Sequence, residues 1–226
     1  MTTTLAILTI GVVPVSEVMP LLTEHISETQ ITHMTLLGNK THAQVMAEYG
    51  PDKGETDTLM TVLADQRLVR LSRRKVEIAL QGIIEVLDNQ GFDVIILMSN
   101  GGFRHLHAHN AMLLEPERIV PPLVASIVDG HQVGVMLPVP EFMEAQHSKW
   151  APLSHAPFYA LANPLSDDDN VLLDAGRDMI DKGADVLVLD CPGYHQKHRD
   201  LLQKTLDVPV LLSNVLVARL ASELMD

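Results

Sequence analysis

Cys191, the only cysteine of the 226-residue chain, is the residue best suited to chemistry. It stands in LDCPGYH, after the apolar run Val186–Leu189 and before a Pro-Gly turn. A thiol can act as a general acid or as a nucleophile, and a helix beginning after the turn favours the thiolate. Asp190 opposes the thiolate only if it faces the sulfur, and strand alternation points neighbours to opposite faces. The alternative is that Cys191 is a buried small hydrophobe without chemistry.

The residues that follow Cys191 add candidate ligands. Gly193 lies in the turn, where backbone N–H groups are free to bind an anion. Tyr194 offers a hydroxyl, or only packs. His195 is close enough in sequence to tune the thiol or to bind a substrate anion, and as the alternative it is a polar residue at a helix start. His195 and His198 share one face if this segment is helical.

Ser99 occupies the position of Cys191 in a second, similar segment. Residues 91–101 (GFDVIILMSNG) align without a gap on residues 183–193 (GADVLVLDCPG). In each, a helix ends at glycine, an aspartate follows, and an apolar strand leads to a small polar residue and a turn. The openings 5–14 and 133–140 match loosely. We therefore expect a duplicated fold with two facing lobes, although any α/β protein repeats units of this kind.

Polar residues follow other predicted strands as well. In open α/β sheets ligands bind beyond the carboxyl ends of the strands, and a glycine turn leading into a helix leaves N–H donors unpaired. A carboxylate is a ligand that such N–H donors can bind. Serine and asparagine after strands are also common caps and turn formers. The predicted substrate-binding residues at strand ends are Thr9, Gly11, Asn100, Gly101, Gly102, Ser213 and Asn214.

Two further clusters contain side chains that could bind an anion or a metal ion. Arg70, Arg73, Arg74 and Lys75 are the only dense basic cluster, at a helix start where positive charge opposes the macrodipole. Arg73 or Arg74 is therefore predicted to meet a substrate carboxylate or phosphate, with a solvated face as the alternative. His105, His107 and His109 would share a face on a strand but not on the helix expected after Ser99, so we predict no metal site.

The elements that must position these residues alternate between strand and helix, which predicts an α/β fold with parallel sheets. Short apolar runs predict the buried strands, and two helices show apolar periodicity and end at a glycine. The predicted helices are Ser72–Asn89 and Asp169–Lys182; the predicted strands are Leu5–Ile10, Val94–Met98, Val133–Leu137, Val186–Leu189 and Val208–Leu212, with Ile31–Leu37 and Phe158–Ala162 as weaker candidates.

The domain organisation follows from the repeat. Residues 1–115 are expected to form the first α/β lobe, with 208–226 packing back onto it, and residues 116–207 the second. With 46% hydrophobic residues the chain can bury a core, and its apolar runs are too short to span a bilayer. The start MTTTLAILTIG lacks a basic n-region and a cleavage site, so a cytoplasmic protein without a signal peptide or membrane contact is expected.

Charge and motifs exclude some partners. The formal net charge of −13 repels phosphate backbones, so nucleic-acid binding is not expected. Neither a G-x-x-x-x-G-K-[ST] loop nor a G-x-G-x-x-G fingerprint occurs, so no nucleotide cofactor is predicted. The expected partner is a small carboxylate-containing metabolite, without a cofactor.

Several stretches make a resemblance specific. LDCPGYH at 189–195 resembles the second cysteine motif of the aspartate/glutamate/hydantoin racemase superfamily. The whole chain looks like the AroM family, through LAILTIGVVP, SRRKVE, EVLDNQGFDVI, LDCPGYHQKHRDLLQK and DVPVLLSNVLVARLA. The resemblance implies two similar Rossmann-like lobes related by a pseudo-twofold, an active cleft between them, cofactor-free carbon-acid chemistry, and dimerisation.

The resemblance also implies roles for the two repeat positions. In the racemases two cysteines flank the substrate α-carbon, one removing the proton and one returning it. Here Ser99 stands at the first position, which argues against two-cysteine racemisation. A single cysteine is similar to the arylmalonate decarboxylase arrangement, in which it protonates an enediolate. We therefore predict a lyase or isomerase with Cys191 and Ser99 as catalytic residues; the alternative is a non-catalytic binder of a small carboxylate or aromatic-pathway metabolite.

Overall fold

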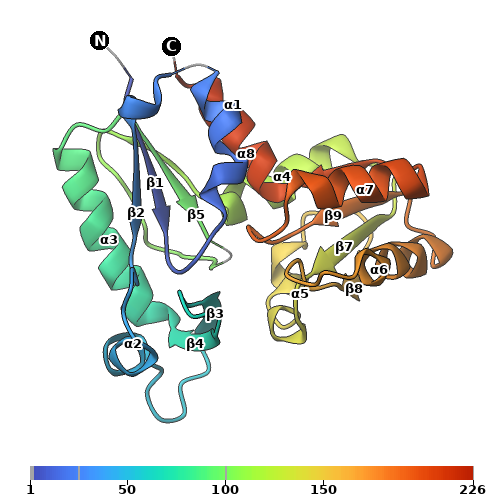
Figure 1. Cartoon of the computed structure of the whole chain (residues 1–226), viewed down its shortest axis with the longest axis horizontal. Helices are drawn as coiled ribbons and strands as arrows, with labels where there is room; N and C mark the ends of the chain where they lie inside the picture. Colours follow the sequence, from blue (N-terminus) through green and yellow to red (C-terminus); the bar gives the residue numbers. More distant parts are fainter. Residues whose placement is uncertain (1–2, 25, 100, 226) are drawn as a thin grey trace. The chain divides into compact units, whose positions relative to one another are not determined.

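The computed structural model describes residues 3–24, 26–99 and 101–225 (Figure 1). The chain divides into two compact α/β units. The first contains residues 3–13, Pro20–Glu115 and 219–225, and the second contains Pro14–Met19 and Pro116–Ala218. The predicted α/β class with two parallel sheets is therefore confirmed. Among the described residues, no helix is both long and apolar enough to cross a membrane.

The first unit is built on a four-stranded parallel sheet of order β2-β1-β5-β6. A separate antiparallel hairpin, β3-β4, lies in the stretch between β2 and β5. The bounds are β1 Leu5–Thr9, α1 Met19–Thr23, β2 Ile31–Thr35, α2 His42–Tyr49, β3 Thr58–Val62, β4 Leu68–Ser72, α3 Arg73–Asn89, β5 Val94–Met98 and β6 Met112–Leu114, with a short 3-10 helix at Glu28–Gln30. The 3-10 helix Val15–Glu17, between β1 and α1 in the chain, belongs to the second unit.

Helix α3 covers one face of this sheet (Figure 1). Strand alternation places Ala6 and Leu8 of β1 on the same face as Ile95 and Leu97 of β5, and these residues pack in one core with the inner stripe of α3. That stripe, with the spacing of one helix face, is Val76, Leu80, Ile84 and Leu87. Ser72 caps the helix, since its hydroxyl accepts the N–H of Lys75 at 3.2 Å.

The second unit has a four-stranded parallel sheet of order β10-β9-β7-β8. Helices α6 and α7 contact each other and the sheet. Gly176 of α6 allows this approach, because a Cβ there would meet the Leu206 side chain of α7 at 2.6 Å. The bounds are α4 Pro116–Ile127, β7 Val133–Leu137, α5 Gln146–Lys149, β8 Phe158–Leu161, α6 Asp169–Asp181, β9 Val186–Leu189, α7 Gln196–Leu206, β10 Val210–Leu212 and α8 Ser213–Ser222, with a 3-10 helix at Pro140–Phe142.

The internal repeat seen in the sequence has a structural counterpart. If β1 is matched with β7 and β5 with β9, the order β2-β1-β5-β6 becomes β8-β7-β9-β10. Asp93 and Asp185 make equivalent hydrogen bonds in the two units. The Asp93 carboxylate accepts the Thr4 N–H and the Asp185 carboxylate accepts the Gln132 N–H, each at 2.8 Å, directly before β1 and β7. Ser99 and Cys191 thus follow equivalent strands.

The structure differs from expectation after Ser99, where no helix forms. Ser99 and residues 101–111 are without helix or strand, and side chains of α3 accept hydrogen bonds from several backbone N–H groups of 101–111. Glu77 accepts the N–H groups of Arg104 at 2.6 Å and His105 at 2.7 Å. Asp88 accepts those of His109, Asn110 and Ala111 at 2.9, 3.0 and 2.7 Å. These bonds replace those that a helix would have made.

The end of the chain is divided between the units. Val210–Leu212 pairs with β9 and so belongs to the second sheet, whereas residues 219–225 lie in the first unit. The prediction that all of 208–226 packs onto the first lobe is therefore correct only for the last residues of the chain. All three residues of β10 pair with β9, so the division falls within α8 and not before β10. The other boundary lies between Glu115 and Pro116.

Candidate functional site

Cys191 lies in a tight turn two residues after β9 ends. The turn is closed by the Tyr194 N–H, which donates to the Cys191 carbonyl at 3.1 Å. The Gly193 N–H donates to the Cys191 Sγ at 3.4 Å, and the cysteine is partly exposed. Helix α7 begins at Gln196, so the amides of its first turn follow His195 and not Cys191. Gly193 was predicted to offer its backbone N–H to a substrate anion; in the structure this N–H donates to the Cys191 sulfur.

Tyr194 and Asn214 hold this turn in place. Tyr194 is fully buried, and its hydroxyl donates to the Ala162 carbonyl at 2.6 Å. Burial, followed by the charges of Cys191 and Asp190, raises the pKa of Tyr194 far above its usual range. Asn214 donates through Nδ2 to the carbonyls of Tyr194 at 3.2 Å and Pro192 at 3.4 Å. Its buried Oδ1 has no hydrogen-bond partner within the described part of the chain.

His195 is oriented by a carboxylate that the sequence did not reveal. Its Nδ1 lies 2.8 Å from Oε1 of Glu17, and the other Glu17 oxygen accepts the Gln196 N–H at 3.4 Å. Glu17 precedes His195 by more than a hundred residues, and nothing in the sequence pairs them. The contact fixes one ring nitrogen of His195, which leaves Nε2 as the atom suited to proton transfer or to an anion.

His198 has a structural role. It is 5% exposed, and its Nδ1 accepts the His195 N–H at 2.9 Å. Burial, helped by the charges of Lys197 and His195, lowers the pKa of His198 from 6.5 to about 4. The ring is therefore neutral at physiological pH. It meets the rings of Tyr194 and His195 edge-on, with centroids at 5.9 and 5.4 Å.

We expect this buried histidine to make the protein less stable in mild acid. A folded-state pKa below the unfolded value means that the stabilisation is present above pH 6.5 and is lost as pH falls towards about 4. The loss is at most about 3 kcal/mol. Urea unfolding between pH 7 and pH 4 should show a shallower decline for His198→Gln than for the wild type. His155→Gln, at an exposed position, is the control and should keep the wild-type slope.

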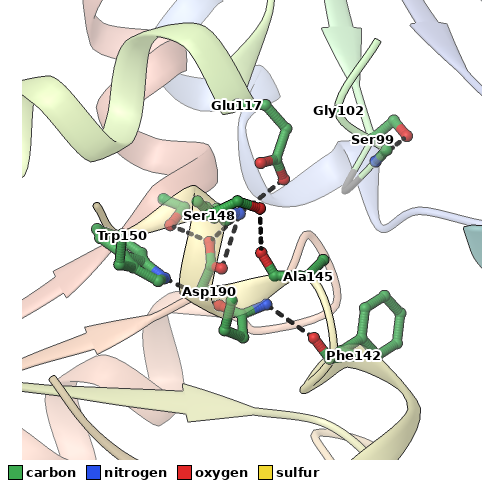
Figure 2. Close-up of polar contacts among 12 residues, drawn as sticks. Ser99, Gly102, Glu117, Phe142, Ala145, Ser148, Trp150 and Asp190 are labelled. Atoms are coloured by element: carbon green, nitrogen blue, oxygen red, sulfur yellow. Dashed lines mark hydrogen bonds and ion pairs between the residues drawn. The ribbon is translucent and has the colours of Figure 1, made fainter. Parts of the chain in front are cut away.

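A buried ion cluster lies directly before Cys191 in the second unit. Lys149 of α5 contacts Glu117 of α4 at 2.7 Å and both oxygens of Asp190, at 2.9 Å to Oδ1 and 2.7 Å to Oδ2 (Figure 2). The exposed fractions of the side chains are 8% for Lys149, 15% for Glu117 and 3% for Asp190. Ser213, at the start of α8, donates to Asp190 at 3.2 Å. The cluster therefore joins β9 to three helices.

The charge of Lys149 is maintained by its partners. Burial alone lowers the pKa of Lys149, but the carboxylates of Asp190 and Glu117 outweigh burial and raise it. Next to it, Trp150 donates to Gln146 and Gln146 donates to the Phe142 carbonyl, both at 2.9 Å (Figure 2). The only sequence signals for this cluster were an aspartate ending an apolar strand and a lysine beside the sole tryptophan.

The predicted residues Ser99, Gly101 and Gly102 follow β5 in the first unit. Ser99 is 8% exposed, and its Oγ accepts the Gly101 N–H at 3.0 Å, a contact drawn in Figure 2. The Gly102 carbonyl accepts a hydrogen bond from Arg73 at 2.8 Å. Asn100 lies outside the described residues. The structure thus brings Ser99, Gly101, Gly102 and Arg73 together, and their contact with a substrate stays a prediction.

The basic cluster is largely engaged with neighbouring residues. Arg73 also pairs with Asp57 at 2.8 Å and donates to the Thr58 carbonyl at 2.9 Å. Arg74 and Lys75 contact Asp52, at 3.4 and 2.7 Å. These acidic residues offset the positive charge at the start of α3. Arg73 thereby ties the β3-β4 hairpin to the turn after β5.

The remaining predicted residues of the first unit are Thr9, Gly11 and the three histidines of the run 105–109. Each contacts a different part of the unit. Thr9 is buried and its hydroxyl lies 3.1 Å from His33 Nε2, whereas Gly11 lies against β3, where a Cβ would strike the Val62 carbonyl oxygen. The side chains of His105, His107 and His109 are exposed on the loop beside α3. No group of three or more potential metal ligands occurs in the residues that the structure describes.

Comparison with known proteins identifies related folds. The model of the AroM protein family matches residues 5–225. Arylmalonate decarboxylase is similar in structure, with a TM-score of 0.61 and 15% identity over 98% of this chain and 92% of that one. Allantoin racemase from Klebsiella pneumoniae has a TM-score of 0.62 and 11% identity over 99% and 87%.

A third similar structure is glutamate racemase from Francisella tularensis subsp. tularensis SCHU S4 in complex with D-glutamate. Its TM-score is 0.59 and its identity 13%, over 100% of this chain and 84% of that one. No curated protein sequence matches the chain significantly. At these identities the three structures establish a shared fold, and the chemistry of this chain has to be argued from its own residues.

Proposed function

The chain belongs to the AroM protein family, and from that premise we propose that it is a cofactor-independent lyase or isomerase acting at the α-carbon of a small carboxylic acid. Cys191 is the reacting group. The fold is shared with a decarboxylase and two racemases, and one of these was solved with D-glutamate. A small carboxylate is accordingly the class of ligand that we propose.

One observation carries this proposal: the only thiol of the chain stands at a strand end built from buried polar contacts. The turn 191–194 is held by Asn214 and Tyr194, and a backbone N–H reaches the sulfur. The unpartnered Oδ1 of Asn214 is a buried acceptor next to this turn, which suits a donor group on a ligand. A buried structural cysteine needs none of these features.

Ser99 favours one-cysteine chemistry. The equivalent position in the first unit holds a serine whose hydroxyl accepts the Gly101 N–H. A serine without an activating base is a poor base at neutral pH, so removal and return of a proton by two matched thiols is not proposed. Ser99 and the amides after it are proposed to hold a carboxylate or enediolate. Cys191 then protonates the enediolate on one face.

The second candidate function is a non-catalytic binder of a small carboxylate or an aromatic-pathway metabolite. The same Ser99 substitution supports it, because a fold of this type without its second thiol still offers donors at the strand ends. The two candidates differ in turnover. An enzyme catalyses the exchange or loss of a group at the α-carbon of its ligand, whereas a binder leaves the ligand unchanged.

The proposal is tested by incubating the protein with small mono- and dicarboxylic acids in D₂O. Proton NMR reports exchange at the α-carbon, and released carbon dioxide reports decarboxylation. We expect one of these signals for at least one acid, at a rate proportional to protein concentration. Binding of an acid without either signal would favour the binder. The cytoplasmic location and the homodimer stay predictions.

A further inference from the structure

Arg73, the first residue of α3, joins the β3-β4 hairpin to the loop after β5. Its Nε donates to the Asp57 carboxylate at 2.8 Å and its Nη2 to the Thr58 carbonyl at 2.9 Å, where the hairpin begins. Its Nη1 donates to the Gly102 carbonyl at 2.8 Å, and the side chain is 18% exposed. Because the guanidinium is a rigid plane, it fixes the three acceptors relative to one another.

The hairpin that Arg73 holds also touches the loop after β1. The Val12 N–H donates to the Val62 carbonyl at 2.9 Å, at the end of β3. A Cβ at Gly11 would lie 2.2 Å from the same carbonyl oxygen and 2.5 Å from Thr61 Oγ1, so this approach needs a glycine. The hairpin therefore lies against the loop in which Gly11 is a predicted ligand.

The same hairpin touches the loop after β5 through Leu59. A Cβ at Gly101 would lie 3.3 Å from Leu59 Cδ2. Leu59 and Thr61 are alternate residues of β3, so their side chains point to one face of the hairpin. The ends of β1 and β5 lie side by side, with Thr9 opposite Met98. One face of the hairpin thus contacts both loops that contain predicted ligands.

Two backbone donors of the loop after β5 are open to a ligand. The Gly101 N–H is used by Ser99 Oγ, whereas those of Gly102 and Phe103 have no hydrogen-bond partner among the described residues. The Gly102 carbonyl and the Phe103 N–H belong to one planar peptide. By holding the carbonyl, Arg73 therefore also fixes the direction of the Phe103 N–H. A donor fixed in advance stabilises a developing anion best.

We propose that Arg73 is a positioning residue, which fixes the Gly102–Phe103 peptide against the β3-β4 hairpin so that the Phe103 N–H serves as a donor to the substrate carboxylate or enediolate. Arg73 itself does not bind the substrate. This inference rests on the proposed function and deepens it, because it assigns one donor of the anion site. It also replaces the direct contact between Arg73 and a substrate that the basic cluster suggested.

The kinetics of Arg73→Lys and Arg73→Gln separate positioning from direct contact, with the acid that the exchange or decarboxylation assay identifies. Lysine keeps the positive charge but has one nitrogen, so it cannot hold three acceptors in a plane. Both variants should therefore lower kcat about 10²-fold, because a donor displaced by about 1 Å no longer meets the transition state. KM should stay close to the wild-type value. A raised KM with unchanged kcat, and retention of affinity by lysine alone, would show direct contact and overturn the proposal.

Hydrogen exchange of the free protein tests the positioning without a substrate. In Arg73→Lys the N–H groups of Gly101 and Val12 should exchange at least about tenfold faster, because the hairpin and the loop lose a shared charged donor. Those of Arg104 and His105 should change less, since a different side chain of α3 holds them. A general loss of stability would speed all four equally. Wild-type exchange at Gly101 and Val12 in the folded variant overturns the proposal.

Arg67→Lys is the matched control. Arg67 lies between β3 and β4, pairs with Asp65 and has a side chain that is 58% exposed, so kcat and exchange should stay at their wild-type values. If Arg73→Lys does not fold, Asp57→Ala removes one partner of Arg73 at a position that is 68% exposed. It should lower kcat and speed Gly101 exchange by about threefold. No change in either would then overturn the proposal.

Failure of the proposed function gives a different result. If no acid is turned over by the wild type while Arg73→Lys speeds exchange at Gly101 and Val12, Arg73 positions the loop of a binding site and the enzymatic proposal fails. If Arg73→Lys turns over an acid at the wild-type rate, the enzymatic proposal stands and the positioning role of Arg73 fails.

Discussion

Lys149→Met is expected to destabilise the second unit by about 3–5 kcal/mol, the largest effect of a single substitution that we predict. The change would leave the carboxylates of Glu117 and Asp190 buried without their shared cation. Removing one partner of a buried ion pair costs more than the pair itself contributes, because the remaining charge stays desolvated. Urea unfolding followed by circular dichroism measures the loss.

The matched control is Lys182→Met. Lys182 also pairs with an aspartate, Asp178, but its side chain is 49% exposed. Exposed pairs of this kind contribute about 0.3–0.5 kcal/mol, so this variant should unfold close to the wild type. Equal unfolding midpoints for Lys149→Met and Lys182→Met would show that the buried cluster does not hold the second unit together.

Cys191→Ala should abolish turnover of the acid identified by the exchange or decarboxylation assay. Loss of a positioned general acid lowers kcat by about 10²–10⁴-fold. Cys191→Ser should be equally inactive, because a serine hydroxyl is a far weaker acid than a thiol. The affinity for the acid should change little, since the donors at the strand ends remain. Steady-state kinetics and calorimetric titration measure the two quantities separately.

The stability of these variants is the necessary control. Cys191 is partly exposed, so both variants should unfold within about 1 kcal/mol of the wild type. An alanine variant that retains more than a tenth of the wild-type kcat would exclude Cys191 as the proton donor, and the acid would have to be sought elsewhere, with His195 as the first choice.

The sheets and the duplication could be predicted because their signals are local. Runs such as Val94–Met98 and Val186–Leu189 are short and uniformly apolar, as buried parallel strands are. The apolar periodicity likewise identified α3. The alignment of 91–101 with 183–193 correctly matched Ser99 with Cys191, because each follows the equivalent strand of its unit.

The contacts that could not be predicted from the sequence join residues far apart in the chain. Lys149 lies 32 residues from Glu117 and 41 from Asp190, and no local pattern links them. The loop after Ser99 is held along α3 by Glu77 and Asp88, so the expected helix is not needed to satisfy its backbone. The β3-β4 hairpin is not among the predicted strands, because its strands are short and mixed in polarity.

The central claim is that Cys191 belongs to a carboxylate site, and its alkylation by iodoacetamide tests this most directly. The rate is measured from pH 5 to pH 9 with and without a panel of small carboxylic acids. As the only cysteine, Cys191 gives an unambiguous signal. We predict that one acid slows alkylation in a saturable manner, and that the same acid is turned over. A thiol that reacts equally with and without every acid would contradict the claim.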